Sequence, residues 1–165
     1  MQKIIKLAVM DFETYNNLIE TTLAFLGLNP VDARSSEKGQ WVLYNGDTEI
    51  YIDMWEQKSQ NAWLYFESEE PLFIFQVISP VAYLPTVNTE QFYQELLHNN
   101  LNMLYASYTI NKEENVLAVK FRRICNGLKQ EDIVEAIESI GFYSETTYKA
   151  LMDRYDIAKI EIEEN

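Results

Sequence analysis

The apolar residues of this chain recur first with the period of a helix and then with the period of a strand. From Asp11 to Leu26 they return every three or four positions, as on one face of an amphipathic helix. Gly27 and Pro30 follow, and a glycine with a proline downstream is typical of a helix C-terminus. The small and polar residues 31–39 then predict a loop.

Beyond this loop the period changes to two, which predicts a β-hairpin. Its strands are Trp41 to Tyr44 and Thr48 to Trp55, with Asn45-Gly46 between them. Asn-Gly between two alternating runs predicts a type I′ turn, because both residues tolerate a positive φ. In the second strand the aliphatic positions that begin with Ile50 share one face. One face of the sheet is therefore expected to lie on the core.

The remaining elements complete an α+β order. They are predicted strands at 62–67 and 72–78, the second closed by Pro80 and Pro85; a helix from Thr89 to Asn99 with Asn88 or Thr89 as its N-cap; strands at 103–110 and 116–124 joined by a hairpin at 111–115; and a last helix from after Gly127 to Tyr155 that Gly141 can kink. The sequence leaves open whether 72–78 is a fourth strand or the continuation of a long bent one. The order α-β-β-β-α-β-β-α predicts a single domain over 1–165, in which an antiparallel sheet is flanked by helices.

Acidic side chains outnumber basic ones by 26 to 13, which gives a net charge of −13. A field of this sign repels phosphate groups, so we expect neither a nucleic acid nor a membrane surface as a partner. A basic partner would be attracted, although solubility alone also accounts for the excess of acid. No segment has the roughly 20 apolar residues of a membrane span, and Asp11 and Glu13 follow Lys3 and Lys6 too closely for a signal-peptide core. We expect a cytoplasmic protein.

Catalytic and metal-binding residue types are scarce in this chain. Its one cysteine, Cys125, and one histidine, His98, are too few for a zinc or iron site or for a nucleophilic triad. The five glycines are isolated and form no phosphate-binding loop. We interpret Cys125 as inert packing and Asn45-Gly46-Asp47 as a turn rather than a cation site. The chain is therefore expected to be no enzyme and to hold no cofactor and no metal.

Aromatic side chains occupy a sheet face on which a solvated sheet would carry short polar ones. They are Tyr51, Trp55, Trp63 and Tyr65, with acids interleaved at Glu49, Asp53 and Glu67. Exposed rings of this size favour aggregation unless something covers them. A helix of the same chain, a second subunit or a client peptide could do so. We predict that these aromatic residues bind a protein or peptide segment that is basic or amphipathic, because burial in a core would strand the carboxylates.

A second apolar surface is predicted on the helix that begins at Thr89. Phe92, Tyr93, Leu96 and Leu97 form i,i+4 pairs, which make an apolar surface that is wide for so short a helix. Closed two-fold dimers are the commonest oligomers. We therefore predict that these four residues, together with the strand that follows, form a homodimer interface.

Two local patterns accompany this order of elements. Leu96-Leu97 and Leu101-Asn102 lead into Leu104-Tyr105, and the sequence Gly-Leu-Lys-Gln-Glu-Asp-Ile at 127–133 opens the last helix. With the size and acidity of the chain, they resemble the type III secretion chaperone fold, and more closely its YbjN-like, Tir-chaperone-like branch, from about Asp11 to Tyr155. The resemblance implies a homodimeric non-enzyme that holds a partner segment and offers no catalytic residues.

The leading hypothesis is thus a protein-binding module, chaperone-like or adaptor-like. The alternative is a sensory or signalling regulator that uses the same fold to bind a protein or a small ligand.

Overall fold

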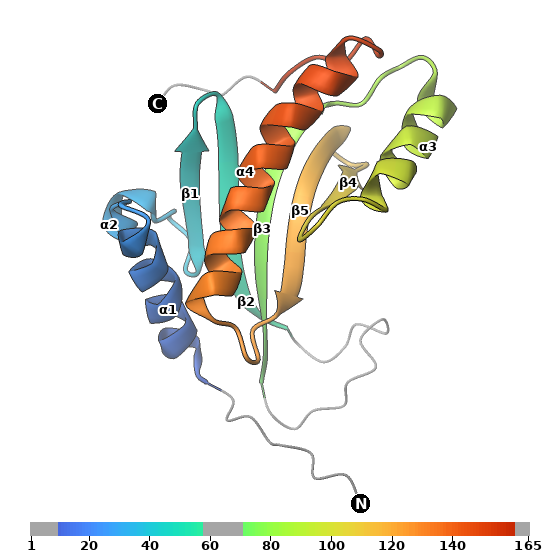
Figure 1. Cartoon of the computed structure of the whole chain (residues 1–165). Coiled ribbons are helices and arrows are strands. Elements are labelled where there is room, and N and C mark those ends of the chain that lie inside the picture. Colours follow the sequence, from blue (N-terminus) through green and yellow to red (C-terminus); the bar gives the residue numbers. More distant parts are fainter. Residues whose placement is uncertain (1–9, 58–70, 161–165) are drawn as a thin grey trace, which may run out of the picture.

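The computed structural model describes residues 10–57 and 71–160 (Figure 1). The predicted strand at 62–67, with Trp63 and Tyr65, lies outside the described residues. The elements within them are α1 (Phe12–Phe25), α2 (Pro30–Ala33), β1 (Gln40–Asn45), β2 (Thr48–Gln57), β3 (Leu72–Tyr83), α3 (Thr89–Asn100), β4 (Ser107–Asn111), β5 (Val116–Ile124) and α4 (Gln130–Met152). The predicted α+β order is confirmed, with the short α2 added to it.

The described strands form one antiparallel sheet in the order β1-β2-β3-β5-β4. In this register Tyr51 of β2 lies opposite Ile78 of β3, which in turn lies opposite Lys120 of β5. Residues that face each other across an antiparallel ladder point to the same side of the sheet. The register therefore assigns every strand residue to one of two faces.

One of these faces carries the hydrophobic core. Trp41, Ile52, Phe75, Val77 and Val119 point from four strands towards the helices and are almost completely buried. The long helix α4 crosses this face over β2, β3 and β5, and α1 packs beside it (Figure 1). The prediction that one face of the sheet lies on the core is confirmed.

The first two helices, α1 and α2, are joined by residues 26–29. The predicted helix α1 is confirmed, and Asp11 caps it by accepting a hydrogen bond from the Thr14 N–H at 2.9 Å. The predicted loop at 31–39 is partly wrong, because Pro30–Ala33 form the single turn α2. Asn29 caps this turn, and Pro30 is its first residue, where the missing N–H has no helical partner to lose.

The predicted hairpin between β1 and β2 is confirmed, but its turn differs. Asn45 pairs with Thr48, so Gly46 and Asp47 are the central residues. Of these two, only Gly46 has a positive φ, at 59°. A type I′ turn requires a positive φ at both central positions. The prediction of a type I′ turn centred on Asn45-Gly46 is therefore wrong, because Asn45 still belongs to β1.

The strand predicted at 72–78 is longer than expected. β3 continues through Pro80 to Tyr83, so the prediction that Pro80 closes it is wrong. Pro80 lies where the β3–β5 register shifts, between Pro80 and Ala82. It also lies beyond Ile78, the last β3 residue that pairs with β2. A proline at a bulge is tolerated because the ladder is already interrupted there.

The strand predicted at 103–110 is shorter in the structure. β4 begins only at Ser107, and Tyr105 has a φ of 55°, which breaks the extended run. β4 is the outer strand of the sheet, and the side chain of Asn100 at the end of α3 reaches its free edge. Asn100 Oδ1 accepts from the Tyr108 N–H at 2.7 Å, and Nδ2 donates to the Tyr108 carbonyl at 3.4 Å.

The predicted last helix is confirmed and is continuous. α4 runs from Gln130 to Met152 without a break at Gly141. It is joined to the outer strand by a 2.8 Å hydrogen bond between Tyr108 Oη and Thr147 Oγ1. This contact fixes β4 to the helix that covers the centre of the sheet.

Candidate partner-binding surfaces

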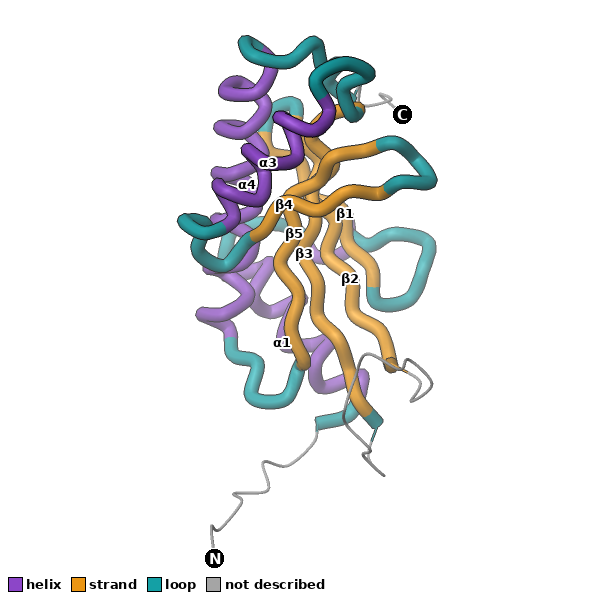
Figure 2. Tube along the Cα trace, turned by 90° about the vertical axis from the view of Figure 1, so that its right-hand side faces the viewer, coloured by secondary structure: helices purple, strands orange, loops and turns teal. Residues whose placement is uncertain are grey.

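No described helix covers the sheet face opposite α1 and α4 (Figure 2). We call it the open face. Its side chains come from all the described strands: Val42 and Tyr44; Glu49, Tyr51, Asp53 and Trp55; Ile74, Gln76 and Ile78; Lys120, Arg122 and Ile124; and Thr109. Within this face Ile74 and Gln76 are buried, whereas Tyr51, Trp55 and Ile78 are partly exposed.

Two of the predicted aromatic residues, Tyr51 and Trp55, lie on the open face and are partly buried. The Tyr51 hydroxyl donates to a Glu49 carboxylate oxygen at 2.6 Å. Burial, and after it the hydrogen bond to Glu49, raises the pKa of Tyr51 far above its ordinary value. Trp55 Nε1 donates to Gln57 Oε1 at 3.3 Å. The Tyr51 hydroxyl and the Trp55 indole N–H thus both have hydrogen-bond partners within the chain.

Three polar side chains cross the centre of the open face in one row, which we call the polar ladder. Gln76 on β3 stands between Asp53 on β2 and Arg122 on β5. Gln76 Nε2 donates to Asp53 Oδ2 at 2.9 Å, and Gln76 Oε1 accepts from Arg122 Nε at 2.8 Å and also from Arg122 Nη2. The guanidinium lies over the Trp55 ring, 5.2 Å from its centroid. These contacts satisfy the buried amide of Gln76, which would be costly to leave unpaired.

A second cation, Lys120, lies on β5 two residues before Arg122. Its Nζ donates to Thr109 Oγ1 at 3.4 Å. Burial lowers the pKa of Lys120 below its ordinary value, and the neighbouring charge of Arg122 lowers it further. The β5 side of the open face therefore holds two cations close together.

Sequence reasoning found the acids of the open face but missed Gln76 and Arg122. A signal for Gln76 was present, because it interrupts the otherwise apolar run from Leu72 to Ile78. Its partners could not be read, since Asp53 and Arg122 are far from it in the sequence and only the strand register brings them together.

Of the four residues on α3 that were predicted to form a dimer interface, two are buried and two are exposed. Phe92 and Leu96 are buried in the core of their own chain, and the Phe92 ring packs edge-on against Tyr155 at 5.1 Å. Their side chains therefore have no surface to offer a second chain. Tyr93 and Leu97 lie on the outer side of the helix and are exposed.

This outer side continues beyond the helix as an exposed apolar surface. Leu97, Leu101 and Leu104 are 69%, 80% and 70% exposed, and Tyr93 and Tyr105 are exposed beside them in the sequence. We call these five residues the α3 patch. Figure 1 shows α3 at the side of the sheet, beside β4. The Leu104 N–H donates to Tyr143 Oη of α4 at 3.2 Å, which ties this end of the patch to the core helix.

The described residues show no cluster suited to catalysis by a metal or a thiolate. Within them, no group of three or more His, Cys, Asp or Glu side chains is placed to hold a metal ion. Cys125 is fully buried, and burial raises the pKa of its thiol to about 12 despite the opposing effect of Arg123. Such a thiol stays protonated and is a poor nucleophile. The interpretation of Cys125 as packing is confirmed.

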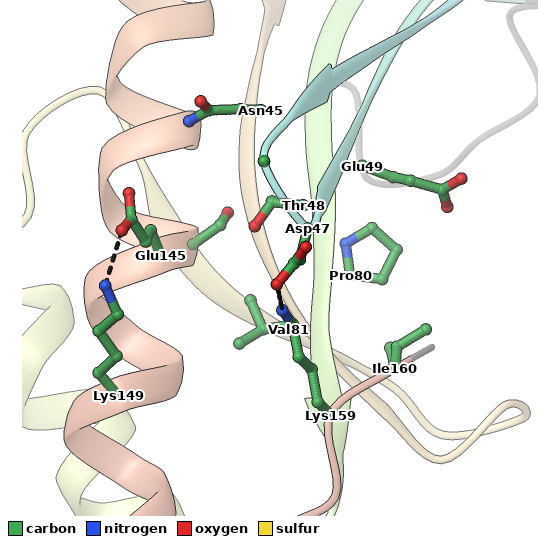
Figure 3. Close-up of a pocket in the computed structure, with 12 residues that line it drawn as sticks. Asn45, Asp47, Thr48, Glu49, Pro80, Val81, Glu145, Lys149, Lys159 and Ile160 are labelled. Carbon is green, nitrogen blue, oxygen red and sulfur yellow. Dashed lines mark hydrogen bonds and ion pairs between the residues drawn. The ribbon is translucent and has the colours of Figure 1, made fainter. Parts of the chain in front are cut away.

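A cavity of about 280 Å³ lies between the β1–β2 turn, α4 and the segment that follows α4 (Figure 3). Lys149 on α4 pairs with Glu145 at 2.7 Å, and Lys159 pairs with Asp47 of the turn at 3.2 Å. The first pair lies within α4, and only the second links two walls of the cavity. Asp47 serves to attach the last described segment to the turn.

None of the helices in the described part of the chain is long and apolar enough to cross a membrane.

Comparison with known proteins gives matches in fold and none in sequence. No protein-family model matches the chain, and no curated protein matches it. A chain from the HopA1–SchA chaperone–effector complex is 8% identical, with a TM-score of 0.58 over 86% of this chain and 99% of that chain. A chain from the ExsC–ExsE complex is 12% identical, with a TM-score of 0.58 over 86% of this chain and 97% of that one. This protein has the α+β fold of the type III secretion chaperones.

Proposed function

We propose that this protein is a non-enzymatic protein-binding module, chaperone-like or adaptor-like, that acts as a homodimer in the cytoplasm. The observation that carries the proposal is the open face. It presents the partly exposed rings of Tyr51 and Trp55 together with Ile78, with no described helix over them. A structural neighbour that comes from a chaperone–effector complex supports a protein as the partner.

The partner segment docks on the open face. Aromatic rings that combine an apolar body with a polar end are enriched at the centres of protein interfaces. Trp63 and Tyr65 are separated by one residue, which is the spacing of neighbours on one face of a strand, and they remain part of the predicted site. The net charge of −13 disfavours a nucleic acid or an anionic membrane in place of a protein.

The homodimer forms through the α3 patch. Leucines as exposed as Leu97, Leu101 and Leu104 make an apolar surface of the kind that a partner covers. In a two-fold dimer the same patch of each chain contacts its counterpart. The interface is thus narrower than the sequence predicts, because only Tyr93 and Leu97 of the predicted four reach the surface.

The test is a selection from a display library of random 15-residue peptides against the full chain, followed by synthesis of the enriched peptides. We expect Trp55→Ala to weaken their binding about tenfold or more, as the loss of an interface anchor does, with the melting temperature nearly unchanged. The matched control is Phe142→Ala, which removes an exposed ring from α4 and should leave both quantities as they are. If Trp55→Ala instead costs several kcal/mol of folding stability, as large core truncations do, the open face is core and the proposal fails.

A further inference from the structure

The charges of the open face are sorted by strand. Glu49 and Asp53 lie on β2, Lys120 and Arg122 lie on β5, and β3 between them presents uncharged residues to this face. Neighbouring strands are about 4.8 Å apart, so the two charged rows are separated by about 10 Å. Within the described part of the chain none of the four takes part in an ion pair. The face therefore has a negative side and a positive side that do not neutralise each other directly.

Arg122 is held in a fixed orientation at the positive side. Gln76 Oε1 accepts hydrogen bonds from Nε and Nη2 along one edge of the guanidinium, and Cζ lies over the Trp55 ring, 5.2 Å from its centroid. The end of the guanidinium, formed by Nη1 and the second Nη2 hydrogen, has no partner among the described residues. Two parallel N–H groups are the arrangement that binds a carboxylate at both oxygens.

The carboxylates of the negative side also have oxygens without a partner among the described residues. Asp53 engages Gln76 through Oδ2, and no described residue donates to its Oδ1. Glu49 accepts from Tyr51 through Oε2 alone. Each carboxylate thus keeps one oxygen for an ammonium or guanidinium group from a partner.

We propose that the polar ladder makes the open face selective for a protein segment with both charges: a basic side chain over β2 and a carboxylate about 10 Å away over β5, with apolar side chains between them. The inference rests on the proposed function and names the chemistry of the partner at that same surface. The net charge of −13 alone would favour a wholly basic segment. Such a segment would meet Lys120 and Arg122 on β5, and like charges across an interface oppose docking.

The peptide selection tests this when it is repeated on charge variants of the full chain. Arg122→Glu puts a carboxylate in place of the guanidinium and, with Lys120 still present, leaves the β5 side without net charge, so its peptides should lose the acidic residue and keep the basic one. Asp53→Lys leaves the β2 side without net charge, because Glu49 is still present, and its peptides should lose the basic residue and keep the acidic one. The matched control is Lys112→Glu, the same change of charge at an exposed position in the β4–β5 turn, which should select the same peptides as the wild type.

The synthetic peptides give the magnitude. Those selected on the wild type should bind Arg122→Glu and Asp53→Lys about three- to tenfold more weakly, and the difference should shrink in ~1 M salt, which screens exposed charges. Should a charge reversal prevent folding, Arg122→Gln and Asp53→Asn remove one charge each and should relax the corresponding preference.

The outcomes separate this inference from the proposed function. Peptides that depend on Trp55 but show no charge preference on any variant would overturn the role of the polar ladder and leave the binding surface intact. A change in selection with Lys112→Glu as large as with Arg122→Glu would also overturn it, because net charge would then govern binding. If no enriched peptide depends on Trp55, both the proposed function and this inference fall.

Discussion

Replacing Phe92 by alanine should destabilise the fold strongly, whereas replacing Leu97, on the other side of the same helix, should not. Phe92 is completely buried, and its ring lies edge-on to Tyr93 at 5.7 Å and to Tyr155 at 5.1 Å. Removing a buried phenylalanine ring costs about 3–5 kcal/mol. Since a domain is stabilised by only about 5–15 kcal/mol in total, this single truncation removes a large share. Leu97 is 69% exposed, and a surface substitution changes stability by about 0.5 kcal/mol or less.

Urea unfolding followed by circular dichroism measures both effects. With a slope of about 2 kcal/mol per molar urea, a loss of 4 kcal/mol moves the midpoint by about 2 M. The comparison should be made at low protein concentration, because dimer formation would add a concentration-dependent term to the stability of the wild type. Equal losses for Phe92→Ala and Leu97→Ala, or a larger loss for Leu97→Ala, would show that the inner and outer sides of α3 are assigned wrongly.

Three further predictions concern other parts of the chain. The double variant Leu101→Ser, Leu104→Ser should have the mass of a monomer in light scattering at micromolar concentration. Val31→Ser, at another exposed position, should remain a dimer. A monomer mass for the wild type would contradict the α3 interface. Gly39→Ala should lower the free energy of unfolding by about 2 kcal/mol or more, because φ is +81° and the new Cβ would lie 2.4 Å from the Met54 carbonyl oxygen. Gly27→Ala, at a φ of +79° but with open space around it, should lower it by only about 1 kcal/mol. Equal losses of stability would refute the close approach at Gly39. Cys125 should resist thiol reagents at pH 8 until urea unfolds the chain. Because burial raises its pKa from 9.0 to about 12, its contribution to folding stability should be complete below pH 9 and lost between pH 9 and 12. Cys125→Val should not show this loss.

The elements that the sequence predicts well are those whose signals are local. The period-two runs around Gly46 and the helical stripe before Gly27 need only neighbouring residues to be read, and both match β1, β2 and α1. The end of β3 was predicted wrongly at Pro80. A proline is tolerated there because the register between β3 and β5 shifts, and this shift depends on two strands that are distant in the sequence. A local rule treats proline as a strand end, and the tertiary ladder overrides it.

The same difference between local and long-range signals applies to the candidate site. Alternation along the strand predicts Tyr51, Asp53 and Trp55 on one face, and the structure places them there. The partners of Asp53 could not be found by alternation, because Gln76 and Arg122 belong to strands whose order and register are fixed by the whole sheet. The apolar stripe on α3 could also be read from the sequence. Which side of it meets the core could not, because its buried residue Phe92 packs against Tyr155, which follows α4.

The amide of Asn100 occupies a position on the outer edge of β4 that a sixth strand would otherwise take. It supplies one acceptor and one donor to the backbone of Tyr108, as a neighbouring strand does. Free edges of this kind are where sheets from different molecules join and grow into fibres. A single side chain from a helix therefore limits the lateral growth of this sheet, and Asn100→Ala would expose a backbone N–H and carbonyl to which another chain can hydrogen-bond. The protection of this edge thus depends on the side chain of one residue outside the buried core.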